Sequence, residues 1–339
     1  MTGSPAAPLP PVVVPFAVRA MPHVRPDLWP LTRPVPPHVE DDGPRTLVRI
    51  DAEVPRLVAA ARQRVATDPA PWTSHTPDLA PGDALTAGLA LGRAVSRDVP
   101  ELLMAAGDSL TVSAAGVGVT SGGRIDRQPV TSGGEDRVAS RQVADRLAAV
   151  PPEHRLLEAV ALAVAEDVVL VDASGRAVWL HVCTPSGWDP GAAAGRHLSE
   201  LHGPVPAADR LRAASDALTR AIVTSGPHVR WVWGLTDDPA AAHHPRFRGP
   251  PATARGPIAE LTFRAERQTT LALPDLGLGV FLIRVLRAPL GEVASSVSRR
   301  ARLAEAIEVM PPELARYKGV ADRRDELLDW LTAPAEPRR

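Results

Sequence analysis

The chain has 339 residues, of which 45% are hydrophobic, so it can bury the core of one large domain or two ordinary ones. Its formal net charge of −1 provides no electrostatic footprint for nucleic acid and no attraction to an anionic membrane. The one cysteine, Cys183, excludes an internal disulfide and a cysteine-held iron–sulfur cluster, and the absence of a long apolar run or secretory signal predicts a soluble, cytoplasmic protein.

The first 136 residues predict a region that packs on the core without forming its sheet. Repeated prolines over 1–45 predict an extended arm over the surface, because proline fixes φ and removes a backbone donor. Helical spacing of apolar residues predicts helices over 54–65 and 83–94. Residues 105–136 are rich in Gly, Ser and Thr, which favours loops or short hairpins.

The pattern becomes more regular from residue 137 onward. Apolar residues at helical spacing alternate with β-branched runs bounded by turn residues. The predicted helices cover 137–147, 153–165, 191–202, 207–223, 290–309 and 321–330. The predicted strands cover 168–171, 177–182, 229–235, 258–271 and 279–286.

The order of these elements predicts an α+β fold. Two strands, two helices and three further strands are typical of an antiparallel five-stranded sheet with helices on one face. A PAS domain has the same order and holds a cofactor between sheet and helices, although other α+β folds share it. We therefore divide the chain into an N-terminal region (1–136), a PAS-like core (137–290) and C-terminal helices (291–339).

His202 lies where a predicted helix ends, in Leu201-His202-Gly203-Pro204-Val205-Pro206. A glycine followed by proline stops the helix and fixes the exit of the chain. A rigidly held neutral imidazole suits the axial position of a haem iron. The alternative is a structural histidine that interacts with the helix dipole.

Two arginines fall on apolar strand faces. Alternation places Arg267 with Leu261, Phe263 and Ala265, and it places Glu266 and Gln268 on the opposite face. Arg284 likewise alternates with Val280, Leu282 and Leu286. A buried guanidinium needs a carboxylate partner. That partner is either an acidic ligand such as a haem propionate or an internal residue such as Glu266 or Glu260, unless the head reaches solvent.

Tryptophan and cysteine side chains give weaker indications of a site. Trp231 and Trp233 share a strand face and are either core residues or a cofactor wall. Cys183 is either a thiolate ligand or nucleophile or a small buried hydrophobe, and alternation leaves His181 as the base on its face.

Taken in order, several stretches resemble the haem-dependent oxidative N-demethylases, which are related to dimethylamine monooxygenase haem subunits. The resemblance covers residues 158–290 well and the N-terminal third thinly. The matching pieces are Glu166-Asp167, Cys183-Thr-Pro-Ser-Gly-Trp188, Leu201-His202-Gly-Pro-Val-Pro206, Trp233-Gly-Leu-Thr-Asp237-Asp238-Pro239, Arg264-Ala-Glu-Arg-Gln-Thr269 with Leu273-Pro274, and Phe281-Leu-Ile-Arg284 ending at Pro289-Leu290, with Pro15-Phe16 near the start.

The resemblance implies a PAS-like fold around one haem b. Reduced iron would activate O₂ and oxidise an N-methyl carbon, and the carbinolamine would collapse to formaldehyde and the shorter amine. Electrons would come from NADPH through a flavin and an iron–sulfur centre on a separate reductase. The implied substrate is an amine or N-methylated small molecule, and a homo-oligomer is compatible with this expectation.

Carried over residue by residue, the resemblance makes His202 the proximal iron ligand and Arg267 and Arg284 the partners of the propionates. Glu266, Gln268, Trp233 and Cys183 become candidates for the pocket. Thr184 and Val285-Leu286 stand where the family often has an aromatic residue and a tyrosine. A specialised tailoring oxygenase that acts on a larger molecule is therefore as compatible with the sequence as a small-amine demethylase.

Two other functions are compatible with the same order of elements: a haem-PAS gas or redox sensor, and a haem-free PAS-like binding module. A sensor normally carries an output module or a long signalling helix. The predicted C-terminal helices are of moderate length and are separated by Pro311-Pro312. The sequence therefore favours the enzyme.

Overall fold

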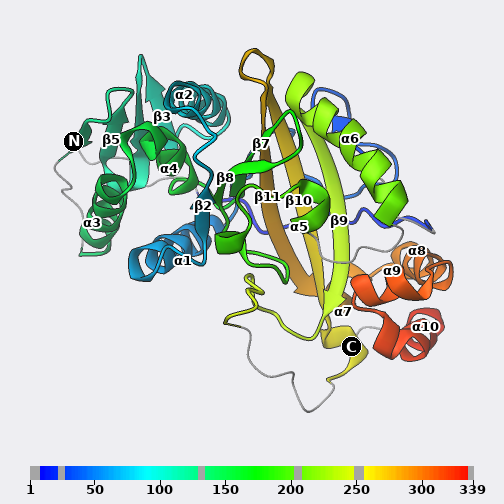
Figure 1. Cartoon of the computed structure of the whole chain (residues 1–339). Coiled ribbons are helices and arrows are strands. Elements are labelled where there is room, and N and C mark those ends of the chain that lie inside the picture. The colour runs from blue at the N-terminus through cyan, green and yellow to red at the C-terminus, as the bar shows by residue number, and fades with distance from the viewer. Residues whose placement is uncertain (1–7, 22–26, 129–133, 202–207, 248–255, 335–339) are drawn as a thin grey trace.

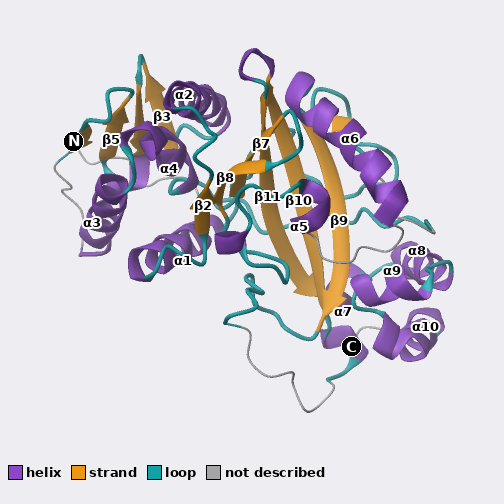
Figure 2. Ribbon diagram, in the orientation of Figure 1, coloured by secondary structure: helices purple, strands orange, loops and turns teal. Residues whose placement is uncertain are grey.

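The computed structural model describes residues 8–21, 27–128, 134–201, 208–247 and 256–334. These residues form an α+β protein with two antiparallel sheets, which confirms the predicted class (Figures 1 and 2). The larger sheet has seven strands, and a smaller one of four strands lies toward the N-terminal part of the chain.

The seven strands follow the order β1-β9-β10-β11-β7-β8-β2, and every neighbouring pair is antiparallel. The five predicted strands are all present and adjacent to one another. The strands are β1 (Trp29–Pro30), β2 (Thr73–His75), β7 (Asp167–Asp172), β8 (Ala177–His181), β9 (His228–Thr236), β10 (Thr262–Leu273) and β11 (Leu278–Pro289).

The sheet is therefore two strands wider than predicted. Its outer strands β1 and β2 span two and three residues. Such short segments contain too few residues to show alternation in sequence. They pair with β9 and β8, the strands that would otherwise form the edges.

One face of the sheet is covered by the segment between β8 and β9. Helix α6 (Ala208–Thr224) packs against β7, β10 and β11, and Ile222 packs with Phe281 and Ile283. The predicted helix over 191–202 is wrong. A 3-10 turn spans Pro190–Ala192, and α5 covers only Leu198–Leu201.

Glycine explains why this helix is interrupted. Gly195 adopts φ +79°, a left-handed conformation that an α-helix does not contain. The backbone N–H of Gly195 donates to Ala177, and the N–H of Ala177 donates to Arg196, so the segment follows the end of β8. The regular apolar spacing predicted a helix, but the backbone of this segment forms hydrogen bonds with Ala177 instead of continuing the helix.

The opposite face packs against elements that precede β7 in the chain. Helices α2 (Pro81–Asp98), α3 (Gly134–Ala149) and α4 (Arg155–Ala161) pack against the small sheet of β3 (Leu103–Ala106), β4 (Ser109–Val112), β5 (Val117–Thr120) and β6 (Ile125–Arg127), and α1 (Val54–Thr67) packs against α3. A continuous apolar core joins this region to Leu170, Val280 and Leu282 of the large sheet.

The described parts of the proline-rich arm are extended, as predicted; residues 8–13 are exposed on the surface, but most of residues 14–18 are buried. Phe16 and Val18 are buried in a second core with Phe263 and Leu286. The rings of Phe16 and Phe263 stack with centroids 6.2 Å apart. The prolines correctly indicated that the described part of the arm has no helix, but they gave no information on which of its residues are buried.

The described C-terminal residues form four α-helices where two longer ones were predicted. The segment 290–309 divides into α7 (Leu290–Val293) and α8 (Val297–Glu308), because the Ser296 side chain caps α8 by accepting from Arg299 N–H. Helix α9 (Pro312–Tyr317) and α10 (Arg324–Thr332) follow. No described helix is long and apolar enough to cross a bilayer.

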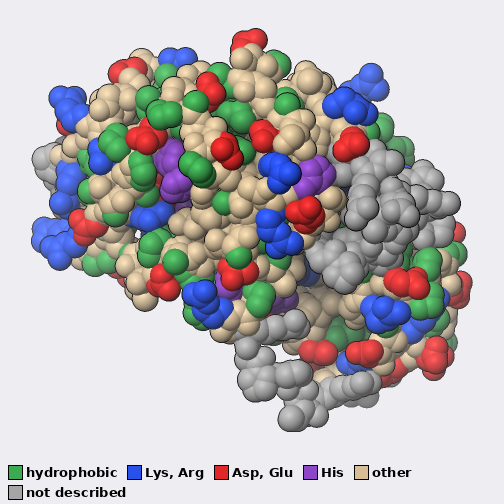
Figure 3. All heavy atoms as spheres, in the orientation of Figure 1, with side chains coloured by type: hydrophobic (Ala, Val, Ile, Leu, Met, Phe, Trp, Pro, Cys, Tyr) green, Lys and Arg blue, Asp and Glu red, His purple; other side chains and the backbone are tan. Residues whose placement is uncertain are grey.

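The surface carries charges of both signs. Acidic and basic side chains are interspersed on the face shown in Figure 3. That distribution agrees with the near-zero net charge of the chain.

Candidate functional site

A cavity of about 690 Å³ lies beside the face of the large sheet that α5 and α6 cover. Its lining comes from four parts of the chain: strands β7, β9, β10 and β11, the segment 184–201, the N-terminal arm and the end of α9. Cofactor and ligand sites usually enclose 300–1,000 Å³ and combine apolar walls with a few polar groups.

The strands provide an apolar floor and a polar side. Val169, Phe281 and Ile283 line the cavity from β7 and β11. Glu266 and Gln268 line it from β10, as the predicted alternation requires. The sequence therefore placed these two polar side chains on the correct face.

Glu266 is held by hydrogen bonds from neighbouring side chains. Gln268 Nε2 donates to Glu266 Oε2 at 2.8 Å, and Ser186 Oγ donates to Oε1. Arg264 Nη2 in turn donates to Ser186 Oγ at 2.9 Å and to the Thr184 backbone oxygen at 3.0 Å. These bonds fix a carboxylate at the cavity wall.

Asp167 is a second carboxyl group of the lining. Its oxygens accept from Cys183 N–H at 2.6 Å and from Thr184 N–H and Oγ1. Burial raises the pKa of Asp167 to about 6 in spite of these hydrogen bonds. Asp167 can therefore exchange a proton near neutral pH.

Arg230 is a cation with incomplete hydrogen bonding. It lies on β9 directly opposite Gln268, and it lines the cavity. Its Nε is buried without a hydrogen-bond partner among the described residues. A buried N–H of this kind is costly unless an acceptor binds it. Arg230 is thus prepared for an anionic group.

Aromatic side chains line the cavity near the edge of the sheet. Trp233 stacks on Phe263 with ring centroids 5.7 Å apart and an interplanar angle of 9°. Trp231 donates through Nε1 to Asp42 Oδ1 at 2.5 Å. Trp29 and Trp188 also belong to the lining. The sequence left open whether Trp233 is a core residue or part of the cavity wall. In the structure it is both, because it is buried and also lines the cavity.

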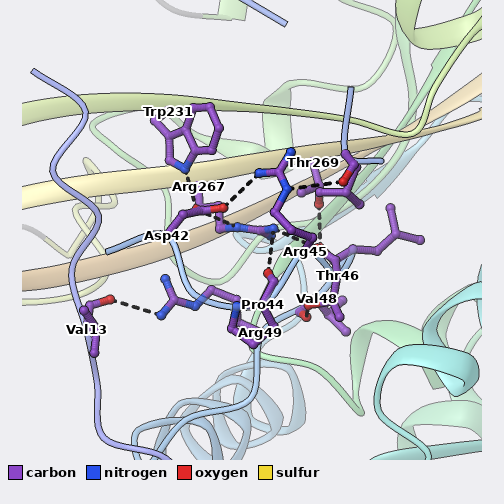
Figure 4. A network of polar contacts seen from close by, with 12 residues as sticks. Val13, Asp42, Pro44, Arg45, Thr46, Val48, Arg49, Trp231, Arg267 and Thr269 are labelled. Atoms are coloured by element: carbon purple, nitrogen blue, oxygen red, sulfur yellow. Dashed lines mark hydrogen bonds and ion pairs between the residues drawn. The ribbon is translucent and has the colours of Figure 1, made fainter. Parts of the chain in front are cut away.

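Arg267 and Arg284 lie on the other face of the sheet and do not line the cavity. Arg267 Nε donates to Asp42 Oδ1 at 3.1 Å, and its Nη2 donates to the Thr46 backbone oxygen at 2.8 Å (Figure 4). Arg284 Nη2 contacts both oxygens of Asp51 at 2.9 Å.

Both guanidiniums therefore have carboxylate partners within the chain. The partners are Asp42 and Asp51 rather than Glu266 or Glu260, the internal candidates that the sequence suggested. The contact of these arginines with an acidic ligand stays a prediction.

Of the two candidate iron ligands, Cys183 lies among the described residues and His202 does not. Cys183 is buried outside the cavity lining, although the next residue, Thr184, belongs to it. His202 lies outside the described residues, while the preceding Leu201 lines the cavity. The iron-ligand role of either residue stays a prediction.

The neighbour of Cys183 is part of a buried ion-pair cluster. His181 Nδ1 lies 3.3 Å from Glu158 Oε1, which also accepts from Arg146 Nε at 2.5 Å. Glu158, with the nearby Cys183 thiol, raises the pKa of His181 to about 10, against the effect of burial. His181 is therefore a protonated partner of Glu158 rather than a free base for Cys183.

The lining contains several polar residues that sequence reasoning missed, among them His38, Arg230, Tyr317 and Lys318. His38 comes from the arm, and burial lowers its pKa, which favours the neutral imidazole. The signal for Arg230 was available, because it alternates with Val229 and Trp231 on a predicted strand. The other three depend on tertiary contacts of segments outside the predicted core.

Among the described residues, no group of three or more His, Cys, Asp or Glu side chains is arranged to hold a metal ion.

Residues 132–328 match the model of the family described as haem-dependent oxidative N-demethylase, alpha subunit-like. The matched residues make up more than half of the chain. They include the strands that form the cavity floor and helices α5 to α9.

Proposed function

Because the chain belongs to the haem-dependent oxidative N-demethylase, alpha subunit-like family, we propose that its cavity holds one haem b and that the protein oxidises an N-methyl group of an amine. The observation that carries this proposal is that the matched residues and the cavity floor coincide. The strand order β9-β10-β11-β7-β8 with helices on one face supports a PAS-like core.

The lining suits the chemistry of a haem. A macrocycle needs an apolar slot, which Val169, Phe281 and Ile283 provide, and its propionates need cations at the rim. Arg230 offers a guanidinium with an unused N–H. We assign the axial position to His202, next to the cavity residue Leu201, and His38 is the described histidine of the lining.

A bound haem would supply the site at which O₂ is activated, with electrons from a separate reductase. The description of the family as alpha subunit-like agrees with a partner that carries the flavin and iron–sulfur groups. The residues of this chain bind and orient the amine. Glu266, held by Gln268 and Ser186, is placed to accept from a substrate ammonium, and Asp167 is placed to take up or release a proton.

The axial ligand is tested by absorption spectra of the ferrous–CO form, with haem supplied during expression. We expect a histidine-type spectrum in the wild type and in Cys183→Ala, and its loss in His202→Ala. A thiolate-type spectrum that disappears in Cys183→Ala would transfer the ligand role to Cys183. No stoichiometric haem in the wild type would leave a haem-free binding module.

The reaction is tested by formaldehyde release from secondary and tertiary methylamines with NADPH and a partner reductase. We expect formaldehyde in proportion to O₂ consumed. Haem binding without formaldehyde from any methylamine would contradict the demethylase assignment and favour a haem-PAS sensor.

A further inference from the structure

Lys318 is the one lysine of the chain, and it lines the cavity. It directly follows helix α9 and the one tyrosine, Tyr317, which lines the same cavity. In a chain whose other basic side chains are arginine or histidine, it is the one side-chain amine and hence the one able to become a neutral nucleophile near neutral pH.

The backbone holds Lys318 firmly against the sheet. Its carbonyl oxygen accepts from Leu235 N–H of β9 at 2.8 Å. Gly319 adopts φ +71°, and a Cβ at this position would lie 2.0 Å from the Leu235 oxygen. A Cβ on Gly234 would approach the Lys318 oxygen to 3.2 Å. Glycines on both sides of the contact therefore permit the close approach that positions the lysine.

The amine group lies among neutral and charged atoms of the cavity wall. Nζ donates to the Trp233 backbone oxygen at 2.7 Å and lies 4.8 Å from the centroid of the Trp233 ring. Among the described residues its hydrogen-bond partner is this carbonyl rather than a carboxylate. The charged groups that face it are Arg230 from β9 and Glu266 from β10, with the Tyr317 hydroxyl from its own segment.

This environment favours the neutral amine. The side chain is half-buried because it opens on the cavity, yet protein atoms surround it on the other sides. Burial lowers the pKa of Lys318 to about 7, Arg230 adds to the effect, and Glu266 opposes it. An ordinary lysine has a pKa near 10.4, so at neutral pH it is almost entirely protonated.

We propose that Lys318 is the nucleophilic amine of the cavity and that it captures aldehydes reversibly. Its nitrogen lone pair attacks the carbonyl carbon, so that the C–N bond forms as the C=O π bond breaks. A proton moves from the nitrogen to the oxygen to give a carbinolamine. Loss of water then gives an imine, and the addition of water releases the aldehyde again. No oxidant or reductant is consumed in either direction.

The identity of the aldehyde rests on the proposed function. Oxidative N-demethylation releases formaldehyde inside this cavity, where Lys318 would hold it before it leaves. The amine chemistry itself requires neither haem nor turnover, so it can be tested separately.

The experiment treats the full-length protein with formaldehyde and cyanoborohydride, which converts an imine into stable N-methyl groups. Peptide mass spectrometry separates Lys318 from the amino terminus. The matched reference is Arg97→Lys, which adds an exposed lysine on α2 to the same molecule. At pH 7 the ordinary pKa of the exposed lysine leaves roughly a thousandfold less neutral amine than a pKa of 7 does.

We expect Lys318 to be methylated at least about tenfold faster than Lys at position 97 at pH 7, with a half-maximal rate near pH 7. Lys318→Arg should abolish methylation at position 318. An equal or slower rate at Lys318, or a rate that rises only above pH 9 at both positions, would overturn the proposal. Since formaldehyde is supplied, these outcomes are independent of whether the protein is a demethylase.

Discussion

At the scale of single residues, partners distant in sequence decide what each polar side chain does. Alternation correctly separated Glu266 and Gln268 from Arg267 on opposite faces of the sheet, but it did not predict that Arg267 and Arg284 lie outside the cavity lining. It could not identify Asp42 and Asp51, which lie more than 220 positions from the arginines they pair with. Local spacing carries the direction of a side chain, whereas its partner depends on how the whole chain folds.

The pair of Arg284 with Asp51 is buried on both sides, since each side chain is 1% exposed. Asp51→Asn should lower the free energy of unfolding by about 3–5 kcal/mol, because it removes the nearer carboxylate from a buried guanidinium and leaves only Glu53, 3.9 Å from Arg284 Nη2. Denaturant titration measures the change. The control is Asp126→Asn in the exposed pair with Arg124, which should cost less than about 1 kcal/mol. Equal effects would show that burial does not govern the pair.

The Glu158–His181 pair predicts how stability depends on pH. The pKa of His181 is raised to about 10, so its contribution is complete below the unfolded value near 6.5 and is lost as pH rises toward 10. The stability advantage of the wild type over His181→Gln, measured as the difference between their free energies of unfolding, should therefore shrink over this range. Parallel pH curves for the two proteins, measured by denaturant titration, would show that His181 is not protonated in the fold.

At the scale of elements, the strands were predictable and several helices were not. β9, β10 and β11 have nine to twelve residues of clear alternation, and each was found within three or four residues of its predicted bounds. The predicted helix over 191–202 failed at Gly195, and the single helix over 290–309 divides at Ser296. Hydrogen bonds to β8 and a serine cap outweighed apolar periodicity, which both segments possess.

The contact between Gly319 and β9 can be tested by comparing alanine variants of two glycines that have similar positive φ angles. Gly319 and Gly277 adopt φ +71° and +62°, but a Cβ on Gly277 would meet no atom within 4 Å. Gly277→Ala should cost only the 1–2 kcal/mol of the left-handed conformation. Gly319→Ala should cost clearly more, because its Cβ would lie 2.0 Å from the Leu235 oxygen. Equal losses in thermal unfolding would mean that this contact does not constrain the segment before it.

At the scale of the whole molecule, part of the cavity lining comes from segments that the sequence analysis placed outside the core. Residues 137–290 supply its floor, but His38 comes from the arm and Lys318 from the C-terminal helices. The arm reaches the sheet through Asp42, which receives hydrogen bonds from Arg267 and Trp231 (Figure 4). Composition could predict that the arm has an extended backbone, but it could not predict the contacts of Asp42 that attach the arm to the sheet.

The central claim, that this cavity holds one haem, is tested most directly by the haem content of the purified protein. We predict one haem per chain in the wild type and a marked loss in Ile283→Trp, which fills the cavity floor. Val138→Trp, at a side chain that is 57% exposed on α3, should retain the wild-type content. Circular dichroism confirms that each variant is folded. Sub-stoichiometric haem in the wild type, or full content in folded Ile283→Trp, would contradict the account.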